Sequence, residues 1–80
     1  MDITVFSKIK PFLSDIYGIS ENDITFETDL FDDLGSDGLD IIELSMILEE
    51  EFDIITDDDK LDKVRTVAEL CEYVTEMQAL

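Results

Sequence analysis

Apolar residues recur every three or four positions in three segments of the chain, and this spacing is typical of one face of a helix. The first segment spans residues 3–17, and its apolar residues are Ile9, Leu13 and Ile16, with Phe6, Phe12 and Tyr17 nearby. Asp2 is the expected N-cap and Gly18 the expected stop. Pro11 lacks an amide hydrogen and clashes with the preceding turn, so we expect a kink there or a first turn loosely tied to the rest.

The second segment, residues 38–52, has apolar residues on two sides. Its core stripe is predicted to consist of Ile41, Leu44, Leu48 and Phe52. Asp37 is the expected N-cap, and Asp40 adds a second acid where the helix dipole favours negative charge. The opposite side carries Leu39, Ile42 and Met46, mixed with Asp40, Glu43 and Glu50. A second apolar line beside carboxylates favours a docking surface for a partner.

Two further helices are predicted towards the C-terminus. The start of a short helix has Thr56 and Asp59 at the spacing of a capping box, and Leu61 and Val64 are expected to point inward. The last helix begins with a second such box, Thr66 and Glu69. Its apolar stripe consists of Val67, Leu70, Val74 and Met77.

Residues 18–36 show no steady period, yet they are rich in apolar side chains. These side chains are Ile19, Ile24, Phe26, Leu30, Phe31 and Leu34, so we expect a loop packed against the core, with one short turn of helix in "TDLFDDLG". No strand pattern and no repeat occurs. The sequence therefore predicts one all-α domain over residues 1–80: a small four-helix bundle of three main helices and one short helix, with a long ordered loop between the first two.

The charge is strongly one-sided. The chain has 22 acidic residues and 5 basic residues, for a net charge of −17. No Lys or Arg occurs between Pro11 and Asp59. Such a field repels nucleic acid and anionic membranes and attracts basic protein surfaces, and its self-repulsion implies that salt or divalent cations stabilise the fold.

Several kinds of catalytic site are excluded by composition. Without histidine there is no Ser-His or Cys-His pair, and the three glycines stand apart, so no phosphate-binding loop is present. We therefore expect no enzyme. Cys71 lies at helical spacing with Leu70 and Val74 and is expected to be a small core residue. One cysteine, no long apolar run and no secretory leader at the N-terminus favour the cytoplasm and no membrane span.

The start of the second helix partly matches a calcium-binding loop. Counted from Asp33, Asp37 and Gly38 fall at the fifth and sixth positions of an EF-hand loop. The third and twelfth positions, which must supply oxygen ligands, are Gly35 and Leu44. No metal site is predicted, although weak cation binding by the acid clusters is expected from charge alone.

The run "DLGSDGLDIIELSMILEEEFDI" strongly resembles the acyl carrier protein family, in which the stretch reads approximately D-L-G-x-D-S-L-D-x-x-E-L-x-x-x-L-E-E-E-F. The matching positions are Asp33, Leu34, Gly35, Asp37, Leu39, Asp40, Glu43, Leu44, Leu48, Glu49, Glu50, Glu51 and Phe52. Gly18, Leu30 with Phe31, and "TVAEL" at the last helix also fit. The resemblance thus covers almost the whole chain.

The resemblance implies a carrier that shuttles thioester-linked acyl intermediates in fatty-acid or related lipid or polyketide biosynthesis, on a 4′-phosphopantetheine arm attached to a serine. The implied partners are the basic surfaces of phosphopantetheinyl transferase, acyltransferases and ketosynthases, met by a monomer. The implied partner-binding residues are Asp37, Leu39, Asp40, Glu43, Met46, Glu49 and Glu50. The implied walls of the acyl pocket are Leu44, Leu48, Leu61, Val64, Leu70 and Tyr73.

The position that the resemblance assigns to the attachment serine is Gly38, which offers no oxygen for the phosphodiester. Ser36 is shifted by two residues and Ser45 lies mid-helix, so neither is expected to replace it. Three explanations are compatible with the sequence: a deliberate replacement that keeps the protein unmodified, a natural carrier that has lost its cargo, or a letter that stands for a modified serine.

Two other functions are compatible with the same features. A regulatory or adaptor module would use the acidic helix to bind a basic partner without carrying cargo. An acidic mimic of nucleic acid would block a DNA-binding protein, and its binding would not depend on Leu39 and Met46.

Overall fold

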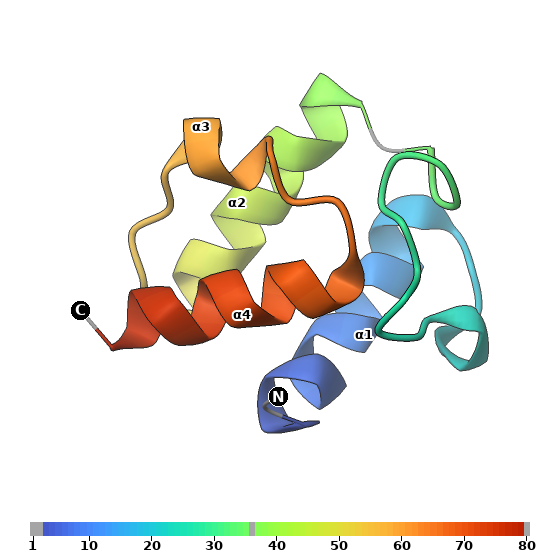
Figure 1. Cartoon of the computed structure of the whole chain (residues 1–80), viewed down its shortest axis with the longest axis horizontal. Helices are drawn as coiled ribbons and strands as arrows, with labels where there is room; N and C mark the ends of the chain where they lie inside the picture. Colours follow the sequence, from blue (N-terminus) through green and yellow to red (C-terminus); the bar gives the residue numbers. More distant parts are fainter. Residues whose placement is uncertain (1–2, 36, 80) are drawn as a thin grey trace.

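Four α-helices and one short 3₁₀ helix make up the regular structure of residues 3–35 and 37–79, which the computed structural model describes. Figure 1 shows their arrangement. In chain order they are α1 (Ile3–Tyr17), η1 (Glu21–Asp23), α2 (Gly38–Phe52), α3 (Asp58–Leu61) and α4 (Val67–Gln78). The prediction of three main helices and one short helix is confirmed. The 3₁₀ helix was not predicted.

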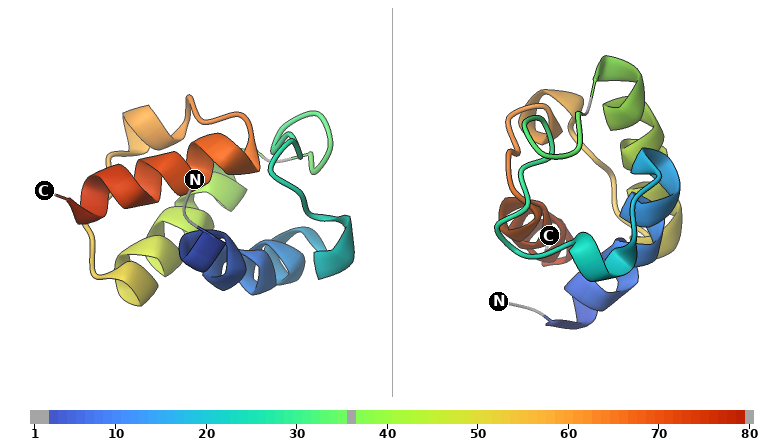
Figure 2. Two further views of the ribbon diagram at one scale, coloured as in Figure 1. Left: turned by 60° about the horizontal axis from the view of Figure 1, so that its bottom comes forward. Right: turned by 90° about the vertical axis from the view of Figure 1, so that its right-hand side faces the viewer.

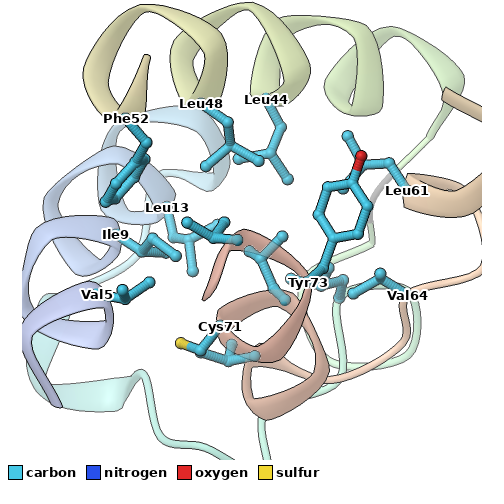
Figure 3. Packing of buried hydrophobic residues seen from close by; sticks show 14 of the residues in the cluster. Val5, Ile9, Leu13, Leu44, Leu48, Phe52, Leu61, Val64, Cys71 and Tyr73 are labelled. Atoms are coloured by element: carbon cyan, nitrogen blue, oxygen red, sulfur yellow. The ribbon is translucent and has the colours of Figure 1, made fainter. Parts of the chain in front are cut away.

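The core lies between α1, α2 and α4, and its side chains come from all three (Figure 3). Helix α1 packs against both α2 and α4, and α3 packs against α2. The predicted stripe of α2 is buried in full, and so are the predicted positions Val67, Leu70 and Val74 of α4. Cys71 is also fully buried, as expected. The stripe of α1 differs slightly, because Val5 is buried whereas Ile16 is only partly buried.

Helix α1 continues through Pro11 without a break. Its first turns are tied to the core, because Val5 is buried together with Ile9 and Leu13, so the expectation of a loosely attached first turn is wrong. The carbonyl group that Pro11 leaves without its helical partner belongs to Ser7, an exposed residue that water can reach. The predicted N-cap Asp2 lies outside the described residues.

The starts of α3 and α4 differ from the predicted capping boxes. The cap of α3 is Asp57, whose carboxylate accepts from the N–H of Asp59, so the assignment of Thr56 as the cap is wrong. Thr56 instead donates its N–H and its hydroxyl to Glu49. Thr66 caps α4 as predicted.

The second half of the predicted box at α4 is absent. The Glu69 carboxylate accepts from the N–H of Arg65 at 3.0 Å, one residue before the cap. The chain enters α4 from an isolated antiparallel bridge between Asp29 and Thr66.

The long loop between α1 and α2 is packed, as predicted, with Ile24 and Leu30 buried. It covers the end of the bundle that lies opposite the C-terminal end of α4 (Figures 1 and 2). Backbone hydrogen bonds join it to the start of α4: Leu30 donates to Arg65, and Val67 donates to Thr28. In the stretch "TDLFDDLG", Asp33 donates to the Asp29 carbonyl and Gly35 to the Phe31 carbonyl, the spacing of the expected helical turn, although the segment forms turns and not a continuous helix.

Charged groups reinforce this junction. Arg65 forms ion pairs of 3.2 Å with both Asp29 and Asp32, and its guanidinium lies 5.2 Å from the centre of the Phe31 ring. The pKa of Asp29 is lowered, chiefly because its carboxylate accepts from the backbone N–H of Asp32; hydrogen bonds from Phe31 and Arg65 and the charge of Arg65 lower it further, whereas desolvation acts in the opposite direction. The loop is therefore attached by backbone pairing and by one arginine.

Candidate functional site

The start of α2 is fixed by two acids that hold each other's backbone. The Asp37 carboxylate accepts from the N–H groups of Leu39 and Asp40, each at 3.0 Å, and the Asp40 carboxylate accepts from the Asp37 N–H at 3.2 Å. The prediction that Asp37 caps this helix is confirmed. The reciprocal bond from Asp40 was missed, although Asp at the third helical position is a shorter analogue of the usual Glu.

Gly38, the first residue of α2, lies in open space. A Cβ atom placed there would have no heavy atom of the described residues within 4 Å, beyond its chain neighbours and its own helix backbone. The backbone at this position does not require glycine, whereas Gly18 and Gly35 both have φ of +67°, a conformation that strains other residues. The helix start therefore accommodates a side chain that the sequence does not supply.

Beside Gly38, apolar side chains point away from the core. Leu39 is 77% exposed, Ile42 53% and Met46 63%. Asp40 lies next to them half-buried, and Glu43 and Glu50 are exposed. We call these six residues the outer face of α2. The arrangement agrees with the predicted second stripe of the helix.

Glu49 plays a part within the molecule that the sequence did not indicate. Its carboxylate accepts from the N–H and the hydroxyl of Thr56, each at 3.0 Å, and so ties α2 to the segment before α3. Ile55, next to Thr56, is 82% exposed and is a further apolar surface residue that sequence reasoning missed. Sequence spacing gave no signal for the bond between Glu49 and Thr56, because it joins α2 to a segment outside that helix.

The six residues that the resemblance assigned to an acyl pocket all belong to the buried core. Leu44, Leu48, Leu61 and Leu70 are fully buried, and Val64 and Tyr73 nearly so. In Figure 3, Tyr73 lies between Leu61 and Val64, with Leu44 and Leu48 above it on α2. The Tyr73 hydroxyl accepts from the N–H of Asp57 at 2.7 Å, which anchors the start of α3 to α4. These residues are thus brought together, as closely packed core.

The other candidate residues are less favourable for chemistry. Ser45 is buried, and its hydroxyl donates to the Ile42 carbonyl at 3.0 Å. Ser36 lies outside the described residues. Among residues 3–35 and 37–79, no cluster of three or more His, Cys, Asp or Glu side chains is placed to hold a metal ion. None of the helices in the same ranges is both long enough and apolar enough to span a membrane.

Comparison with known proteins places these features in a family. The sequence pattern of the family described as "Phosphopantetheine attachment site" matches residues 7–74. The chain is 46% identical to the acyl carrier protein of Clostridium acetobutylicum, over 88% of this chain and 91% of that protein. It is 41% identical to that of Thermotoga maritima (88% and 86%) and 42% identical to that of Clostridium perfringens (90% and 95%).

The prosthetic group of this family does not fit the residues at the start of α2. The family carries 4′-phosphopantetheine. A phosphodiester needs an oxygen atom on the carrier, and Gly38, where the resemblance places the attachment serine, has no side chain. The disagreement concerns one side chain only. The matched pattern and the relatives cover most of the sequence, and the chain belongs to the acyl carrier protein family.

Proposed function

We propose that this chain is an acyl carrier protein that presents α2 to the enzymes of fatty-acid or related lipid or polyketide biosynthesis, in the cytoplasm. Members of this family carry acyl groups and are not enzymes themselves. With Gly38 at the attachment position, we propose further that the chain as written remains in the unmodified form. The observation that carries the proposal is the capped start of α2 directly beside its exposed outer face.

Charge supports the choice of partners. The outer face of α2 lies in a stretch without Lys or Arg from Pro11 to Asp59, so a complementary surface is basic with apolar contacts. Transferases, acyltransferases and ketosynthases with such surfaces are the proposed partners. Each exposed ion pair contributes only about 0–1 kcal/mol, and the set together favours fast, reversible docking. Asp37 and Glu49 already serve as intramolecular acceptors, and we propose that they also add to the attraction.

The core supports the proposed acyl pocket. Leu44, Leu48 and Leu61 are fully buried and come from two helices that pack against each other. An acyl chain would have to separate these side chains, and the apolar surface it covers would offset the loss of their mutual contacts.

The proposal is tested by restoring the hydroxyl. Gly38→Ser and Gly38→Ala are incubated with coenzyme A and a phosphopantetheinyl transferase whose activity has been established on another acyl carrier protein. Intact-mass measurement is expected to show the arm on the serine variant only, because only serine supplies an oxygen. The alanine variant controls for the added Cβ, and the unchanged chain gives the mass of the written sequence.

The second candidate function is an adaptor that binds a basic partner without cargo, and Gly38 is the observation that favours it. Under that function the serine variant gains no mass, although the transferase modifies its control substrate. This outcome would refute the carrier proposal.

A further inference from the structure

At the start of α2, the groups that set the shape of the helix are distinct from the attachment position, Gly38, which lacks the oxygen needed for modification. In the part of the chain that the structure describes, the side-chain hydrogen bonds at the start of α2 are made by the neighbours of Gly38: Asp37 accepts from Leu39 and Asp40, and Asp40 accepts from Asp37. None of these bonds uses a side chain at position 38. The helix start therefore keeps its shape whether that position holds serine or glycine.

The space around position 38 leads to the same conclusion. A Cβ there meets none of the described residues within 4 Å, beyond its chain neighbours and its own helix backbone, so adding this atom would displace none of them. The outer face of α2 is exposed beside it, with Leu39, Ile42 and Met46 more than half exposed. The exposed face that an enzyme could bind is present, whereas the side-chain oxygen that it would modify is absent at Gly38.

We propose that the chain with Gly38 is a competitive ligand of phosphopantetheinyl transferase that is never consumed. This inference rests on the proposed function. A carrier with serine leaves the enzyme as product, whereas the glycine chain can only dissociate unchanged. The partner that we propose is a transferase with a basic, partly apolar surface, because the outer face of α2 carries acidic and exposed apolar side chains.

The test uses Gly38→Ser as substrate and the unchanged chain as inhibitor, at about 0.15 M salt, where screening limits long-range attraction. Increasing amounts of the glycine chain are expected to raise the apparent KM with kcat unchanged. The inhibition constant is expected within about tenfold of the KM of the serine variant, because a single exposed hydroxyl contributes little to docking. Gly38→Ala is expected to inhibit equally.

Matched variants test whether inhibition depends on the outer face of α2. In the glycine chain, Glu43→Gln and Met46→Ser are expected to raise the inhibition constant at least about threefold. Glu72→Gln, which removes the same charge from an exposed position on α4, is the control and is expected to change nothing.

The outcomes distinguish this inference from the proposed function. If the serine variant is modified but a large excess of the glycine chain does not inhibit, the inference is wrong and the carrier function stands. If Glu72→Gln weakens inhibition as much as Glu43→Gln, binding follows total charge, which also overturns the inference. If the serine variant is not modified, the proposed function itself fails.

Discussion

At the scale of single residues, Asp37 has the clearest energetic role. Its carboxylate satisfies two backbone N–H groups that the first turn of α2 cannot pair internally. We expect Asp37→Ala to lower the free energy of unfolding by about 0.5–2 kcal/mol, measured by urea denaturation. Asp37→Asn keeps an acceptor oxygen and should lose much less.

A control is needed because removing any negative charge from this chain relieves repulsion. Glu72→Ala, at an exposed position on α4, removes one charge without touching a cap. Equal stability of Asp37→Ala and Glu72→Ala would contradict the role assigned to the cap.

The caps also show what single-residue patterns can predict. Asp37 and Thr66 were found because a capping residue type directly precedes an apolar helical stripe. Thr56 and Asp57 are both capping types, and local sequence could not choose between them. In the structure Thr56 donates to Glu49, seven positions away on α2, and Asp57 is the cap.

At the scale of elements, the attachment of the long loop to the start of α4 depends on pH through Asp29. The lowered pKa of Asp29 means that folding favours its charged form. Its contribution to stability is therefore fully present above the unfolded-state value of 3.8 and is lost as the pH falls through the lower folded-state value.

We expect Asp29→Asn to be less stable than the unchanged chain at neutral pH, and this difference to shrink in acid as the wild-type carboxylate becomes protonated. Denaturation curves from about pH 7 down to about pH 2.5 measure it. Asp15→Asn, at an exposed position on α1, is the matched control. A difference that stays constant down to the lowest pH would contradict the expected effect.

The loop was predictable only in outline. Its apolar content indicated a packed segment, and Ile24 and Leu30 are buried accordingly. The attachment itself joins Arg65 to Asp29 across 36 positions, and no periodic pattern relates residues that far apart. The acyl-pocket residues were proposed from the family resemblance and not from periodicity. The hydrogen bond between Tyr73 and Asp57, 16 positions apart, had no signal in the sequence.

At the scale of the whole molecule, the net charge of −17 acts against folding through self-repulsion. We expect the melting temperature to rise as sodium chloride increases from about 0.01 M to about 0.5 M, because the Debye length falls from about 30 Å to a few ångströms. A variant with Glu43, Glu50 and Glu51 all changed to Gln should respond less. A melting temperature that falls with salt would contradict this.

The open surroundings of Gly38 have a genetic consequence. Some glycine codons become serine codons by a single base substitution, and a Cβ atom at position 38 has open space around it among the described residues beyond its chain neighbours. The capacity to bear cargo could thus be lost or regained in one mutational step, with folding left under separate selection.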